Sequence, residues 1–90
     1  MAVLLDDSTI RSLAKKTEVL AVVPELSRLV NYQSNCSACQ KSKQASTMLS
    51  IKMTLANLSQ NRAEKLKMVL NTDKITIKYV DNGKQVEKTY

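Results

Sequence analysis

The clearest pattern of apolar and polar positions lies near the end of the chain, where residues alternate on both sides of a short turn. Residues 74–80 and 85–90 each alternate, and Asn82-Gly83 lies at the centre of the turn between them. Successive side chains of a strand point to opposite faces, so this alternation indicates two strands with one covered face. Asn-Gly favours a type I′ turn, because both central residues of that turn need a positive φ. The pattern therefore predicts a β-hairpin from residue 74 to residue 90.

The predicted turn also sets the register of the hairpin. Its cross-strand pairs are chemically compatible, with one opposite-charge pair and one threonine pair. These pairs are Tyr79 with Val86, Lys78 with Glu87, Thr76 with Thr89, and Ile75 with Tyr90. The residues that share the apolar face are Ile75, Ile77, Tyr79, Val86 and Tyr90. Because a lone two-stranded ribbon is barely stable in water, this face needs cover from the chain's own helices or from another subunit.

Helical spacing dominates the first part of the chain. Apolar residues recur every three to four positions over residues 10–21, which predicts a helix of about fourteen residues. Asp7 or Ser8 is placed to cap its first turn through a side-chain oxygen. Pro24 removes a backbone donor and crowds the carbonyl four residues back, so the helix must end or kink near Val22.

A second, shorter helix is predicted over residues 24–32, because proline suits the first position of a helix. A strand over residues 18–23 is the alternative for the stretch before it. Residues 31–37 are polar and rich in turn-forming side chains, so they are expected to form a loop.

Two further helices are predicted in the middle of the chain. Residues 38–58 place apolar side chains around well over half of a helix, with Lys52 inside the apolar arc, and such a helix needs cover on more than one side. Ser59 is a suitable N-cap for the next helix, which runs to about Leu70, and Asn71 is a suitable left-handed terminator. The predicted fold class is therefore α+β, with a small bundle of three to four helices followed by the β-hairpin.

Composition makes this fold a single domain with an uneven charge. Ninety residues support one modest core, and the absence of Phe and Trp leaves it to Leu, Val, Ile, Met and Ala. Acidic and basic side chains cancel in residues 1–35, so the whole net charge of +6 falls after them. We divide the domain into a neutral helical part (1–35), a basic helical hairpin (36–73) and the β-hairpin (74–90).

Motifs that could carry chemistry are few. The chain has no histidine and one glycine, and its spacing assembles no nucleophile–base pair, phosphate loop or carboxylate cluster, so we expect no enzyme activity. Cys36 and Cys39 form the one motif with chemical meaning. A single chain cannot complete a four-ligand zinc site with two thiolates, so plain reduced thiols are favoured over an intersubunit zinc site or a redox pair. No cofactor is expected.

The basic middle part of the chain carries a candidate electrostatic patch. The patch residues are Lys41, Lys43, Lys52, Arg62, Lys65 and Lys67. Such a cluster can neutralise phosphates, and the junction near Ser59 allows a helix-turn-helix interpretation. Charge runs are more often solvated faces, so a loose electrostatic role toward nucleic acid or an acidic protein surface is favoured over specific DNA reading.

The strand over residues 85–90 has one paired edge and one free edge. A free edge can accept a strand from a neighbour, which is a route to assembly. The alternative is a hairpin that lies on its own helices, with its edges guarded by Lys78, Lys84 and Lys88.

The sequence predicts neither a membrane partner nor export. No apolar run reaches the length of a membrane span, and Asp6 and Asp7 follow only a short apolar stretch, unlike a secretory signal. We therefore expect the protein to be in a cytoplasm when it is made.

The order of parts over residues 36–90 carries a family resemblance. A Cys-x-x-Cys turn precedes a Lys-rich helix, the run from Asn61 to Leu70, and the run from Asp73 to Tyr79 with its terminal hairpin. This order resembles small tailed-phage proteins of the accessory or virion type. The resemblance implies a small structural component of a capsid, neck or tail in a virion, and it carries over no functional residues.

Two hypotheses of different class follow from the sequence. The first is a non-enzymatic assembly protein in a homo- or hetero-oligomer, acting through apolar contacts to other protein subunits. Its expected interaction residues are Met48, Leu49, Leu55, Ile75, Ile77, Tyr79, Val86 and Tyr90. The second is a basic regulator that binds nucleic acid or the transcription machinery through the electrostatic patch.

Overall fold

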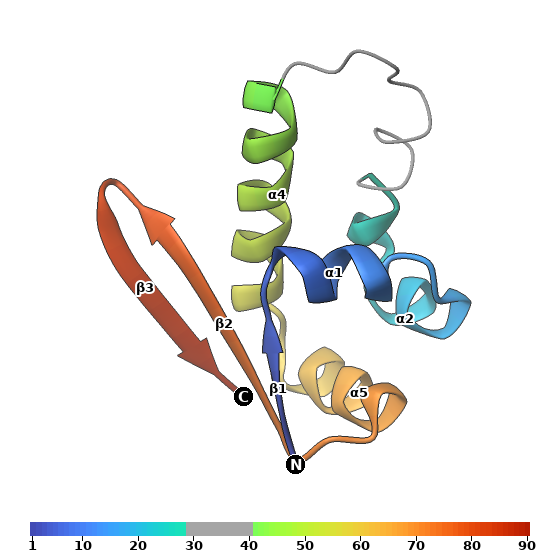
Figure 1. The fold of residues 1–90 in the computed structure, drawn as a ribbon. Coiled ribbons are helices and arrows are strands. Elements are labelled where there is room, and N and C mark those ends of the chain that lie inside the picture. Colours follow the sequence, from blue (N-terminus) through green and yellow to red (C-terminus); the bar gives the residue numbers. More distant parts are fainter. Residues whose placement is uncertain (29–40) are drawn as a thin grey trace.

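The computed structural model describes residues 1–28 and 41–90, and within the second range it describes side chains from residue 46 onward. These residues form a three-stranded sheet with helices on one of its faces (Figure 1). The elements in chain order are β1 (Ala2–Leu5), α1 (Asp7–Leu13), α2 (Thr17–Val22), the 3-10 turn η1 (Pro24–Leu26), α4 (Lys41–Ala56), α5 (Gln60–Leu70), β2 (Lys74–Asp81) and β3 (Lys84–Thr89). The strand order is β1-β2-β3, so β2 is the central strand.

The predicted hairpin is confirmed in turn and register. Asn82 and Gly83 both have positive φ, at 52° and 77°, as a type I′ turn requires. β2 and β3 are antiparallel with Tyr79 opposite Val86, and the other predicted strand pairs hold in the same register. The pairing continues to Ile75 and Tyr90, whose backbone N–H groups donate to each other's carbonyls at 3.3 and 2.8 Å.

The third strand of the sheet was not predicted. β1 runs parallel to β2, from Ala2 opposite Lys74 to Leu5 opposite Ile77. Its register buries Leu5 completely while Leu4, which points to the other face, is 44% exposed. β1 therefore covers one edge of the hairpin and contributes to the core.

The core lies between the helices and the inner face of the sheet. α4 packs on β2, α2 contacts α5 and η1, and β1 leads directly into α1. The buried apolar side chains are Leu5, Ile10, Leu13, Ala14, Val19, Val23, Leu26, Met48, Ile51, Leu55, Ala56, Leu58, Ala63, Leu66, Ile75 and Ile77. The α+β class is confirmed, but the predicted helical bundle is not, because the helices in the described ranges share their core with the sheet.

The single first helix of the prediction is replaced by two short helices. α1 ends at Leu13 and α2 begins at Thr17, so the alternative of a strand over residues 18–23 is wrong as well. The break changes the phase of the buried stripe, since Val19 faces the core while Thr17 is exposed. The predicted N-cap is wrong by one residue: Asp6 accepts a 2.8 Å hydrogen bond from the Thr9 N–H, which holds the pKa of Asp6 below its ordinary value.

Proline has its predicted effect. α2 ends at Val22, and Pro24 takes the first position of η1. Of the predicted helix over residues 24–32, the structure describes this 3-10 turn and the helical residues Ser27 and Arg28 that follow it, and the part from residue 29 onward lies outside the described residues.

The two middle helices follow the prediction closely. α4 covers Lys41–Ala56 of the predicted 38–58, with residues 38–40 outside the described ranges. α5 has both predicted caps: the Ser59 hydroxyl accepts from the Arg62 N–H at 3.3 Å, and Asn71 is left-handed at φ 54°. Val69, near the end of α5, is 38% exposed.

Candidate functional site

The hairpin extends past the strand that flanks it. β1 pairs with β2 only as far as Leu5 and Ile77, whereas β2 continues to Asp81. Figure 1 shows the hairpin projecting from the helical layer, with β3 as its outer strand. Within the described part of the chain, β3 has no strand on its outer side, and the last four residues of β2 have none on the side away from β3. The distal half of the hairpin therefore has two edges to which the described residues add no strand.

A hollow of about 260 Å³ lies where β1 ends and β2 continues. It is lined by Asp7, Met48, Leu49, Lys52, Tyr79 and Val80. Leu49 of α4 and Val80 of β2 are 36% and 51% exposed, so apolar side chains reach solvent beside the hollow. The Lys52 ammonium forms an ion pair with the Asp7 carboxylate, which joins α4 to the start of α1. The hollow thus combines apolar walls with a charge pair that is already neutralised.

The predicted interaction residues divide between the core and the surface. Met48, Leu55, Ile75 and Ile77 are buried within this chain. Leu49, Tyr79, Val86 and Tyr90 keep part of their surface accessible. The sequence could not separate the two groups, because its pattern shows which side chains are apolar and not which neighbour covers them.

Val80 was missed as a surface contact. It lies on the opposite sheet face from Tyr79 by strand alternation, so the predicted apolar face did not include it. A valine among the polar outer positions of β2 was the available signal. We call Leu49, Tyr79, Val80 and Val86 the distal apolar cluster, since the first three line the hollow and Val86 lies directly opposite Tyr79.

Tyr90 anchors the base of the hairpin. Its hydroxyl lies 2.7 Å from the Ala56 carbonyl oxygen and 3.2 Å from that of Leu58, at the junction between α4 and α5. The hydroxyl is a hydrogen-bond donor at neutral pH, and burial raises the pKa of the Tyr90 phenol further above its ordinary value of 10.0. Tyr90 therefore holds the hairpin to the helices, while the opposite end of the hairpin projects.

Metal-ligand clusters are absent from residues 1–28 and 41–90, where no three His, Cys, Asp or Glu side chains could hold one ion together. The predicted cysteine motif, Cys36 and Cys39, lies outside the described residues. No helix in the same two ranges is long and apolar enough to cross a membrane. No protein-family model, curated protein or solved structure matches the chain.

The candidate electrostatic patch is divided by internal ion pairs. Lys52 pairs with Asp7, and Lys67 pairs with Glu64 at 2.8 Å, which lowers the pKa of Glu64. Lys65 is exposed. Lys41 and Lys43 begin α4, but their side chains lie outside the described part.

Arg62, also from the patch, connects three elements. Its Nε and Nη2 donate to the Val22 carbonyl at the end of α2, at 3.2 and 2.9 Å. Nη2 also lies 3.0 Å from Glu25 Oε1 in η1. The guanidinium holds the pKa of the Glu25 carboxyl below its ordinary value. Arg62 thus satisfies a helix-end carbonyl and a partly buried carboxylate at once.

Replacing Arg62 with methionine should lower the free energy of unfolding by about 1 kcal/mol at pH 7, because the alkyl stem stays and the hydrogen bonds are lost. A lowered folded-state pKa of Glu25 stabilises the fold above the unfolded-state pKa, and that contribution is lost as pH falls through the folded value. The difference in free energy of unfolding between the wild type and Arg62→Met should therefore become smaller below about pH 4.3, the ordinary pKa of glutamate. Urea unfolding across about pH 3 to 7 measures this difference, with Lys65→Met as the matched control. An equal loss of stability in both variants would contradict the stabilising role of the Arg62 contacts.

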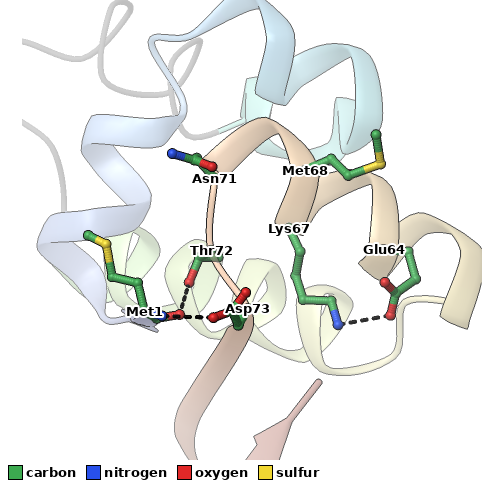
Figure 2. Close-up of a pocket in the computed structure, with 7 residues that line it drawn as sticks. All are labelled: Met1, Glu64, Lys67, Met68, Asn71, Thr72 and Asp73. Atoms are coloured by element: carbon green, nitrogen blue, oxygen red, sulfur yellow. Dashed lines mark hydrogen bonds and ion pairs between the residues drawn. The ribbon is translucent and has the colours of Figure 1, made fainter.

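A second, more polar concavity of about 670 Å³ lies beside the end of α5 (Figure 2). Its lining residues are Met1, Glu64, Lys67, Met68, Asn71, Thr72 and Asp73. The Met1 amino group lies 3.0 Å from Asp73, whose pKa it lowers, and Figure 2 shows Lys67 turned toward Glu64 on the other side. The charges that line this concavity are thus paired with one another, which leaves the hairpin as the better candidate site.

Proposed function

We propose that this chain is a non-enzymatic assembly protein that binds other protein subunits through the distal half of its hairpin. The proposal places it as a minor component of a phage particle, in keeping with the order of parts in residues 36–90. The observation that carries it is the distal apolar cluster, which flanks a hollow between the helices and a projecting hairpin whose distal edges have no strand partner among residues 1–28 and 41–90.

The change in burial along the helix-facing side of β2 supports this proposal. The proximal residues Ile75 and Ile77 are fully buried by the chain's own helices, whereas Tyr79, the next residue on the same face, keeps part of its surface accessible. Isolated exposed apolar residues are common on protein surfaces, but a cluster beside a hollow is typical of contact sites. A side chain from a partner could fill the hollow and cover Leu49 and Val80 together.

The charge arrangement favours assembly over nucleic-acid binding as the main role. Lys52, Arg62 and Lys67 are each held by a carboxylate of this chain. A cation that must neutralise a phosphate would first have to leave its internal partner. A basic regulator that binds nucleic acid is therefore the alternative function, and the experiment must distinguish it from assembly with other protein subunits.

Sedimentation and native isolation at two salt concentrations provide that experiment. The tagged chain is purified from the cells or particles that contain it at about 0.1 and about 1 M salt, and companions are identified by mass spectrometry. We expect a defined complex that persists at high salt, because apolar contacts are not screened. A monomer without companions at both concentrations, or DNA binding that falls steeply with salt, would contradict the proposal.

Leu49→Asp should reduce the recovered complex at least tenfold while the chain remains folded. The carboxylate would have to lose its water when a partner covers the cluster, which is unfavourable in an apolar contact. Met68→Asp is the matched control, because Met68 is 80% exposed on α5, away from the hairpin. The ratio of companion to chain on native gels measures the effect, and circular dichroism checks the fold. Equal recovery for the two variants would assign the contact to another surface.

A further inference from the structure

The outer edge of β3 offers a row of backbone hydrogen-bonding groups. Opposite residues in an antiparallel pair alternate between hydrogen-bonded and non-hydrogen-bonded pairs. Ile75 and Tyr90 form a hydrogen-bonded pair, so the backbone groups of Lys84, Val86 and Lys88 also bond to β2. The N–H and C=O groups of Gln85, Glu87 and Thr89 therefore point outward, where the described part of the chain places no partner strand.

The side chains on this edge leave an unbalanced positive charge. Glu87 pairs with Lys78 across the hairpin, at 3.7 Å. Lys84 and Lys88 are exposed and have no carboxylate within 4.0 Å among the described residues. They flank Val86 on the helix-facing side of β3, at alternate positions of one strand. Along this edge, a positive side chain, an apolar side chain and a second positive side chain thus follow one another at alternate positions.

A second copy of this chain is a poor occupant of the edge. Two β3 strands paired across a two-fold axis can be centred on Val86, Glu87 or Lys88 with substantial overlap. These registers place Lys84 opposite Lys88, Glu87 opposite Glu87, or Lys88 opposite Lys88. Like charges directly opposite one another destabilise a strand pair, so each register opposes self-pairing.

We infer that β3 receives an extended segment of a partner protein as a fourth strand, with acidic residues opposite Lys84 and Lys88 and an apolar residue opposite Val86. This inference rests on the proposed function and names the partner's chemistry. Inward-pointing lysines ordinarily guard a sheet edge against pairing. When the partner strand carries carboxylates opposite these lysines, the same lysines favour that strand over others. The backbone hydrogen bonds then hold the added strand in place.

A pair of synthetic peptides tests the inference on the full chain. Both are blocked at their ends and carry the order charged, valine, charged at every second position, so that these three side chains share one face of the added strand, with threonine between them. The charged residues are glutamate in one peptide and lysine in the other. Amide chemical-shift titration should show binding of the glutamate peptide with shifts at Gln85, Glu87 and Thr89, and at least tenfold weaker binding of the lysine peptide. The double variant K84E/K88E should reverse this preference.

Gln85→Pro separates strand addition from simple charge attraction. The Gln85 N–H faces the free edge, so proline removes an edge donor without removing a bond within the hairpin. We expect the variant to fold and to bind the glutamate peptide at least tenfold more weakly, although both lysines remain. Failure of the glutamate peptide to bind the wild-type chain, or its equal binding to Gln85→Pro, would overturn the inference.

The native complex distinguishes this inference from the proposed function. If the wild-type chain assembles and Gln85→Pro assembles equally well, strand addition is wrong and the assembly role stands. If the wild-type chain has no companions under any condition, the assembly role itself fails.

Discussion

Replacing Leu5 with alanine should lower the free energy of unfolding by about 2 to 5 kcal/mol, because Leu5 is fully buried and the smaller side chain leaves a cavity. A domain of this size has a total stability of about 5 to 13 kcal/mol, so the loss is a large share of it. The midpoint of thermal unfolding should fall by about 8 °C or more. Urea unfolding and calorimetry measure both quantities.

Leu4 provides the matched control within the same strand. Its side chain points to the opposite face of the sheet and is 44% exposed, so Leu4→Ala should cost about 1 kcal/mol or less. A clear difference between the two neighbours is expected only if residues 2–5 form a strand in the observed register. Similar small losses in both variants would mean that β1 does not pack against the core.

Replacing Lys88 with proline should destabilise the fold by about 1 to 3 kcal/mol or more. Lys88 lies opposite Ile77 in a hydrogen-bonded pair, so proline removes its ladder N–H and leaves the inner Ile77 carbonyl without its donor. The hairpin should also lose protection of its remaining backbone amides from hydrogen exchange. Denaturant unfolding and amide exchange detect these effects.

Gln85→Pro is the control for this prediction, three residues earlier on the same strand. Its N–H faces outward, so the ladder remains complete and the expected loss of stability is about 0.5 kcal/mol. The contrast tests the assignment of inward and outward backbone groups on which the strand-addition inference depends. If Gln85→Pro were the more damaging variant, the alternation along β3 would have to be reversed.

Local chemistry made several elements predictable. Asn82-Gly83 supplied both positive φ angles of the turn, and Ser59 and Asn71 supplied the caps of α5. Each of these signals acts within a few residues, where side-chain hydrogen bonds and backbone sterics dominate. The hairpin register was predictable as well, because a two-residue turn at a known position permits only one register between the two strands.

The candidate site was predictable in part. Tyr79 and Val86 were identified as one apolar face, and the free edge of the final strand was recognised. Val80 was missed, and Ile75 and Ile77 proved to be core residues. Three of the predicted patch cations also turned out to be held by carboxylates that lie on other elements or one turn away.

The sequence by itself determined the turn, the register of the hairpin and the caps of α5, because these depend on neighbours along the chain. Only the tertiary structure decided that residues 2–5 join the sheet, that the first helix divides in two, and which apolar residues are covered. A parallel pairing between the two ends of the described chain leaves no local signal, and burial depends on the element that packs opposite. The distal apolar cluster comprises the apolar residues of α4 and of the distal hairpin that this packing leaves accessible.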